Sequence, residues 1–329
     1  MLEKYNIIIY MKSRSYTKIV ETVLILGVGF FLYKCTKSRL YEDDEKKQYE
    51  KVKQYLLTET TLANNRLPIM WIHVPYGMNS RNWESFGSRN TKELNQPYLY
   101  LTIRSLIQCC GNRYQLCMLD DSTFSKIIPN WSIDINSLDE SSKNNVRTLA
   151  MANILHMYGG VLIPPSFICI NNLHELQNQS KMFVGEFISR STSNYSYEFN
   201  TRLMGCKKND VTMKEFILFL EDLTSKDYTE ESIMLNKIGA WCKEKHCNKE
   251  LLKISAQQLG CKDADNKPIL LDRLMSSTFI ELSNDAFGVY VPADELLNRH
   301  AFGWFIRLSP LQVLEADTMI SKFILASNG

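Results

Sequence analysis

The chain has 329 residues, of which 45% are hydrophobic and 22% are charged, so it can bury a large core. Its 14 glycines and 9 prolines exclude collagen-like and low-complexity sequences. The 38 basic and 36 acidic residues are interspersed without a basic arm or stripe, which argues against nucleic-acid binding. Nine cysteines are too dilute for a small disulfide scaffold and leave the redox compartment open.

The N-terminal region contains a long apolar segment, IVETVLILGVGFFLY, between Lys18 and Lys34. As a helix rising about 1.5 Å per residue, this segment is short for a hydrocarbon core of roughly 30 Å, but its flanking lysines can extend to the headgroups. No small-residue cleavage site follows it. We therefore predict a tail at 1–18 and an uncleaved, single-pass signal-anchor at 19–35.

The side of the membrane on which the rest of the chain lies is not defined by the sequence. Basic residues flank the apolar segment on both sides, so the positive-inside rule gives no orientation. Residues 36–65 are charged and free of glycine, which predicts a helical stalk before a globular domain at 66–329. An ER or Golgi membrane and a viral membrane both fit this layout.

Short apolar runs alternate with amphipathic segments beyond residue 66. The predicted strands are 68–73, 114–121, 160–170, 181–188, 201–206 and a segment near Phe279. The predicted helices are 96–110, 122–128, 141–158, 210–223, 230–246 and 310–325. Strands and helices alternating at these spacings predict an α/β fold with a mainly parallel sheet flanked by helices.

Three segments follow an ordered pattern: PIMWIH at 68–73, YQLCMLDD at 114–121, and LAMANILHMYGGVLIPPSFICINNLHEL at 149–176. This arrangement resembles the GT-A-type glycosyltransferases with a DXD motif, in particular the mannosyltransferase-like group, whose members are usually Golgi-anchored. Its most specific part is ILHMYGGVLI, where Gly159 is also well placed to end the preceding helix and Gly160 to begin the next strand. The resemblance implies a nucleotide-diphospho-sugar transferase fold and sugar transfer from a nucleotide-sugar to a glycan or protein acceptor.

The strand after the two glycines departs from the family at the position of the metal ligands. There the family carries two aspartates that hold Mn²⁺ or Mg²⁺ against a diphosphate, and the matching positions here are Pro164 and Ser166. The family's helix also carries an Asp and an Arg, matched by Thr148 and Met151. No metal site is predicted. Two hypotheses stay open: a glycosyltransferase with an altered or metal-independent site, and a catalytically degenerate domain with a binding or structural role.

Other residues are candidates for nucleotide-sugar binding. Asp120 and Asp121 end a strand, where ligands bind in open α/β sheets; the alternative is a turn in which Asp121 caps the helix that begins at Ser122. The resemblance suggests that Trp71 stacks on a base, although a Trp in an apolar strand is more often a core residue.

The C-terminal region contains a basic and aromatic cluster. Arg299 and Arg307 are candidates to meet a diphosphate in place of the missing metal charge; the alternative is a packed final layer with surface arginines. A literal D-x-D at Asp263 and Asp265 is interpreted as a solvated loop. No standard zinc spacing relates Cys242, His246, Cys247 and Cys261.

Overall fold

The computed structural model describes residues 67–74, 96–190, 195–225 and 231–328, and all structural statements below concern these residues. The predicted tail, the signal-anchor at 19–35 and the stalk at 36–65 lie outside them. Within the described ranges, no helix combines the length and the apolar character that a membrane crossing requires.

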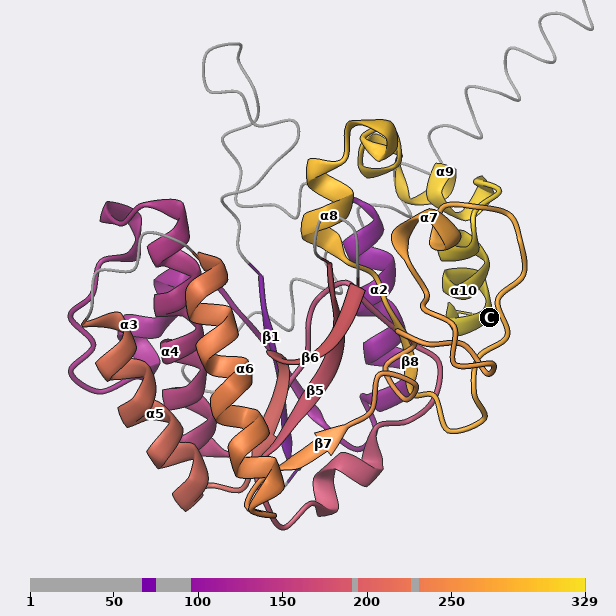
Figure 1. Ribbon diagram of the computed structural model, residues 1–329. Helices are drawn as coiled ribbons and strands as arrows, with labels where there is room; N and C mark the ends of the chain where they lie inside the picture. The colour runs from indigo at the N-terminus through magenta and orange to yellow at the C-terminus, as the bar shows by residue number, and fades with distance from the viewer. Residues whose placement is uncertain (1–66, 75–95, 191–194, 226–230, 329) are drawn as a thin grey trace, which may run out of the picture. The chain divides into compact units, whose positions relative to one another are not determined.

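A six-stranded sheet forms the centre of the described fold, with strand order β2-β1-β3-β6-β5-β7. Figure 1 labels β1, β6, β5 and β7 of this sheet. In that order the strands are Gln115–Leu119, Ile69–His73, Gly160–Leu162, Tyr195–Cys206, Phe183–Arg190 and Leu252–Ile254. Strand β6 is antiparallel to both of its neighbours, and the other pairings are parallel, so β6 alone of these six runs in the opposite direction. The predicted α/β class with a mainly parallel sheet is confirmed.

Helices cover both faces of this sheet, as Figure 1 shows. One buried core lies between the sheet and helices α2 (Tyr98–Cys110), α7 (Leu271–Leu274), α8 (Ala293–Asn298), α9 (Pro310–Glu315) and α10 (Met319–Asn328). The other lies beneath α3 (Phe124–Ile127), α4 (Glu140–Tyr158), α5 (Val211–Thr224) and α6 (Glu231–Cys247). Short 3₁₀ helices are η2 (Asp121–Thr123), η3 (Ile135–Ser137), η4 (His174–Asn178), η5 (His300–Phe302) and η6 (Phe305–Arg307).

The prediction of a single strand at 160–170 is wrong, because this range contains two short strands. Strand β3 ends at Leu162, and β4 (Phe167–Cys169) pairs with β8 (Gly288–Tyr290) in a separate two-stranded antiparallel sheet. Pro164 and Pro165 lie between the two strands, and a proline has no N–H to donate to a central ladder. The prolines therefore direct the chain out of the large sheet into the small one.

Two further predictions near the C-terminus are wrong. The strand near Phe279 is absent from the described residues, and this side chain is 76% exposed in a loop. The helix at 310–325 is divided: Ala316 has an extended backbone after α9, and Thr318 Oγ1 accepts the Ser321 N–H at 3.2 Å at the start of α10. A hydroxyl that satisfies a free N–H in this way is a typical helix start.

The strand order reverses at β1 and β3. From β1 the chain passes through α2 on one face to β2, then returns through α4 on the opposite face to β3, on the other side of β1. In open α/β sheets such a reversal leaves a crevice beyond the carboxyl ends of the strands, where ligands bind. We call this side of the sheet, where β1, β2 and β3 end, the carboxyl edge.

Candidate functional site

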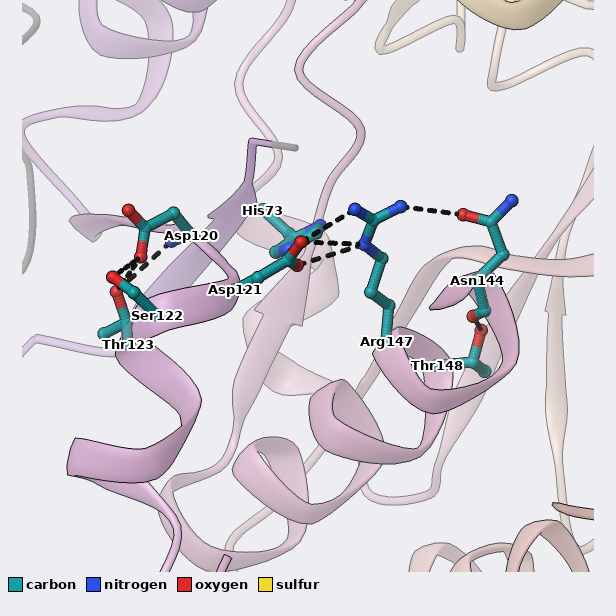
Figure 2. A network of polar contacts seen from close by, with 8 residues as sticks. All are labelled: His73, Asp120, Asp121, Ser122, Thr123, Asn144, Arg147 and Thr148. Carbon is teal, nitrogen blue, oxygen red and sulfur yellow. Dashed lines mark hydrogen bonds and ion pairs between the residues drawn. The ribbon is translucent and has the colours of Figure 1, made fainter. Parts of the chain in front are cut away.

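A polar network centred on Asp121 lies at the carboxyl edge (Figure 2). His73 is the last residue of β1, and its Nε2–H donates to Asp121 Oδ1 at 2.8 Å. Arg147 on α4 donates from Nε to Oδ1 at 3.0 Å and from Nη2 to Oδ2 at 2.7 Å. The third arm of the guanidinium, Nη1, donates to Asn144 Oδ1 at 3.0 Å. Side chains from β1 and α4 thus converge on one carboxylate, which η2 carries.

The network is partly shielded from solvent, which strengthens its electrostatics. The side chains of His73, Asp121 and Arg147 are 12%, 21% and 13% exposed. Burial raises the pKa of the Asp121 carboxyl, but the hydrogen bonds and charges of His73 and Arg147 outweigh it and hold this pKa well below its usual range. The Phe124 ring stacks on the His73 ring, with 5.3 Å between the centroids, and fixes its plane. Asp121 is therefore ionised at neutral pH.

Asp120, and not Asp121, caps the short helix that follows β2. Its Oδ1 accepts the hydroxyl hydrogens of Ser122 at 2.6 Å and Thr123 at 2.7 Å, and its own N–H donates to Thr123 Oγ1 at 3.3 Å (Figure 2). The expectation that Asp121 caps a helix beginning at Ser122 is wrong, because the first turn begins one residue earlier. This shift releases the Asp121 side chain toward β1 and α4.

The positions that match the family's metal ligands carry no group suited to a hard cation. Ser166 is 2% exposed, and its hydroxyl donates to the Val291 carbonyl at 2.7 Å. Pro164 is buried and has no donor atom in its side chain. At the neighbouring strand end, Arg147 already occupies both oxygens of Asp121. Mn²⁺ and Mg²⁺ require oxygen ligands that these residues do not offer, so the ion does not fit.

Replacing Ser166 with alanine tests whether this hydroxyl has a structural role. We expect a loss of about 1 kcal/mol in the free energy of unfolding, because the buried Val291 carbonyl loses a donor. Urea unfolding of the full-length chain measures the loss. In the matched control, Ser125→Ala, the hydroxyl is exposed and the change should stay within about 0.5 kcal/mol. Equal effects of both substitutions would contradict the structural role.

The candidate residues Trp71, Gly159 and Gly160 lie together. The Trp71 side chain is fully buried, and its Nε1–H donates to the Gly159 carbonyl at 2.9 Å. It also packs against Tyr158, with 5.9 Å between ring centroids. Gly159 and Gly160 have φ angles of 72° and 108°, which favour glycine. In this structure the indole therefore holds the helix-to-strand junction from within the core.

A second polar cluster lies beyond the end of β3. The register places Met204 of β6 opposite Leu162, so Arg202 extends past the carboxyl end of β3. Arg202 Nη1 donates to the Tyr290 hydroxyl at 2.9 Å, and its Nη2 forms an ion pair with Asp294. The Tyr98 side chain is fully buried, and its hydroxyl has no hydrogen-bond partner among the described residues. Burial, aided by Tyr290 and Asp294, raises the pKa of this hydroxyl far above its usual range.

The candidate arginines of the C-terminal region lie apart from the Asp121 network. Arg299 donates to both carboxylate oxygens of Asp272, at 2.7 and 2.8 Å, and to Glu295 at 3.1 Å. Its guanidinium carbon lies 4.7 Å from the Phe302 ring centroid. Arg307 ends a 3₁₀ helix and is exposed. Acidic neighbours therefore already balance the charge of Arg299.

The remaining predicted positions have structural surroundings. Thr148 donates its hydroxyl to the Asn144 carbonyl at 2.9 Å, and Met151 is 2% exposed in the core. The interpretation of the D-x-D loop as solvated is wrong for Asp263, which is 5% exposed and accepts from Arg273 Nη1 at 2.9 Å. Within the part of the chain that the structure describes, no three His, Cys, Asp or Glu side chains are placed to hold a metal ion.

His73 and Arg147 are the site residues that sequence reasoning missed. A signal for both exists: His73 ends a predicted strand, and Arg147 lies near the start of a predicted helix that leads into the next strand. In an alternating α/β chain, strand ends and the starts of the following helices share the carboxyl edge. The fold and this network define an α/β protein with a polar site at a strand-order reversal. No protein-family model matches the chain, and no curated protein matches it either.

Proposed function

We propose that the protein is a membrane-anchored, GT-A-like glycosyltransferase relative that binds a nucleotide-sugar at its carboxyl edge without a divalent metal ion. One observation carries the proposal: the strand-order reversal is lined by Arg147 and His73, and not by carboxylates open to a metal. Ligands of open α/β sheets bind at such reversals. Guanidinium and imidazole N–H groups suit the anionic diphosphate of a nucleotide-sugar, which would have to share or displace their present bonds to Asp121 and Asn144.

The hydrogen-bond donors at the carboxyl edge support an anionic ligand. Asp121 is the one carboxylate of its network, and Arg147 and His73 both donate to it, so its negative charge is neutralised within the network. Arg202 places a second guanidinium beyond β3 with 40% of its side chain exposed. A diphosphate at this edge would lie near the carboxylates of Asp120 and Asp294 as well, and it would have to compete with Asp294 for Arg202.

The second candidate function is a catalytically degenerate domain that binds a glycan or has a structural role. It is favoured by the burial of Pro164 and Ser166, because no side chain at these positions can stabilise a leaving diphosphate. Loss of such electrostatic stabilisation costs kilocalories per mole in the transition state. Binding of a nucleotide-sugar without turnover would therefore favour a degenerate relative, and turnover would favour an enzyme with an altered site.

Calorimetric titration of the full-length chain tests the proposal. The ligands are uridine, guanosine and cytidine nucleotide-sugars, each titrated in Mn²⁺ and in EDTA, with hydrolysis followed in parallel. We expect at least one ligand to bind, with affinities in the two conditions within about tenfold, or about 1.4 kcal/mol. Binding that requires Mn²⁺, or binding of no member of the panel, would refute metal-free recognition.

A further inference from the structure

Three thiols from two segments meet on the face of the sheet that α2 covers. Cys109 and Cys110 are the last residues of α2, and Cys169 is the last residue of β4. The Sγ atoms of Cys110 and Cys169 lie 3.8 Å apart, although the two residues are 59 positions apart in the sequence. Sulfurs joined in a disulfide lie about 2.05 Å apart, so the two atoms would have to approach, by rotation about their Cα–Cβ bonds, before they bond.

Side-chain-to-backbone hydrogen bonds hold the two segments side by side. The Cys169 N–H donates to Ser105 Oγ at 2.9 Å, and Asn172 Nδ2 donates to the Cys109 carbonyl at 3.1 Å. The first bond connects α2 to β4, and the second connects the end of α2 to the segment that follows β4. The sulfurs are therefore placed by the fold and do not depend on a loop.

The three thiols differ in access to solvent. Cys110 and Cys169 are buried, whereas Cys109 is partly exposed. Cys109 Sγ donates to the Cys169 carbonyl at 3.3 Å. A hydrogen bond with Cys169 outweighs burial and lowers the pKa of the Cys109 thiol to about 7. A hydrogen bond with Cys169 also lowers the pKa of the buried Cys110 thiol, so access to solvent is what distinguishes Cys109 as the entry thiol.

We propose that Cys110 and Cys169 form a reversible disulfide, and that a small-molecule disulfide oxidises this pair by entering through Cys109. The proposal is independent of the nucleotide-sugar site. The redox state of this cysteine pair would report the compartment that the globular domain faces. The sequence leaves this compartment open.

The exchange balances in three steps with oxidised glutathione as the oxidant. The Cys109 thiolate attacks a glutathione sulfur, which forms a mixed disulfide and releases one glutathione thiolate. Cys169, on losing its proton, attacks Cys109 Sγ and releases the second glutathione thiolate. Cys110 then attacks Cys169 Sγ and releases the Cys109 thiolate, which leaves readily because its pKa is low. Two protein thiols are oxidised, one oxidant disulfide is reduced, and two protons pass to the two glutathiones.

The test incubates the full-length chain with oxidised or reduced glutathione, blocks free thiols with N-ethylmaleimide, and maps unreduced peptides by mass spectrometry. We expect a peptide pair that joins Cys110 to Cys169, formed with oxidised glutathione and lost in reduced glutathione. Because the link closes a long stretch of chain, the Tm should rise by about 5 °C or more on oxidation.

Two variants separate the entry thiol from the pair. Cys109→Ser should slow formation of the Cys110–Cys169 link at least about tenfold without preventing it, because the buried thiols lose their accessible relay. Cys247→Ser, which removes an exposed thiol on another helix, should change neither rate nor product. The proposed pair would be overturned if Cys169 were fully alkylated after oxidation, or if the final product joined Cys169 to Cys109. An unchanged rate in Cys109→Ser would overturn the entry route.

Discussion

Replacing Arg147 with methionine is expected to destabilise the protein by about 2–3 kcal/mol at neutral pH, as for the loss of one partner from a mostly buried ion pair. The Asp121 carboxylate, 21% exposed, would keep only the His73 donor and lose three guanidinium contacts. Urea unfolding of the full-length chain measures the effect. Arg113→Met is the matched control: Arg113 is exposed, and its substitution should change stability by less than about 0.5 kcal/mol.

The pH dependence of this loss identifies the carboxylate as its cause. The folded-state pKa of Asp121 lies below its value in the unfolded chain, so its stabilising contribution is present above the unfolded pKa of about 4. That contribution falls as the pH decreases from there toward the folded pKa. The stability difference between wild type and Arg147→Met should therefore be full at pH 7 and should shrink below about pH 4. A difference independent of pH would indicate lost packing and not a lost ion pair.

Gly160→Ala is expected to cost about 3 kcal/mol or more, or to prevent soluble expression. Its φ of 108° is strained for any residue with a Cβ, and an added Cβ would lie 2.2 Å from the Ile69 carbonyl oxygen. Strand β1 would have to move away from β3, which opens the junction that carries the candidate site. Thermal unfolding, or soluble yield where no folded protein is obtained, measures the effect.

Gly239→Ala provides the control for this substitution. Gly239 lies within α6, and the nearest atom to an added Cβ is the Phe199 carbonyl oxygen at 3.9 Å. Alanine has the higher helix propensity, so this variant should be more stable by about 0.5–1 kcal/mol. A Gly160→Ala variant as stable as wild type would contradict the tight approach of β3 to β1.

The elements near the Gly-Gly junction could be predicted because their signals are local. The apolar run at 68–73 and the helical spacing of 141–158 ended by Gly159 correspond to β1 and α4 in the structure. The break after β3 was missed because the run GVLIPPSFICI is apolar throughout, while its two halves pair with different strands. The prediction of a strand near Phe279 failed for the opposite reason. This apolar side chain is exposed in a loop, although its hydrophobic character indicated a buried strand.

The candidate site depends on contacts that no local pattern contains. Asp121 is 48 positions from His73 and 26 from Arg147. The parallel register of β1 and β2 brings His73 to Asp121, and the packing of α4 on the sheet brings Arg147. The hydrogen bond of the Ser166 hydroxyl joins it to Val291, 125 positions away in the sequence. No pattern near residue 166 could therefore predict this bond. The sequence could identify strand ends as candidate positions. It could not identify the side chains that pair with the charged residue at each strand end.

Photoaffinity labelling tests most directly whether a nucleotide-sugar binds at the carboxyl edge. The full-length chain would be irradiated in EDTA with a photoreactive analogue of the nucleotide-sugar that binds most tightly, then digested and mapped. We expect labelled peptides that contain His73, Asp121 or Pro164–Ser166, with labelling suppressed by the unmodified nucleotide-sugar. Labelling that the unmodified ligand does not suppress, or that falls on Lys207–Asp210 beside the opposite end of β3, would contradict it.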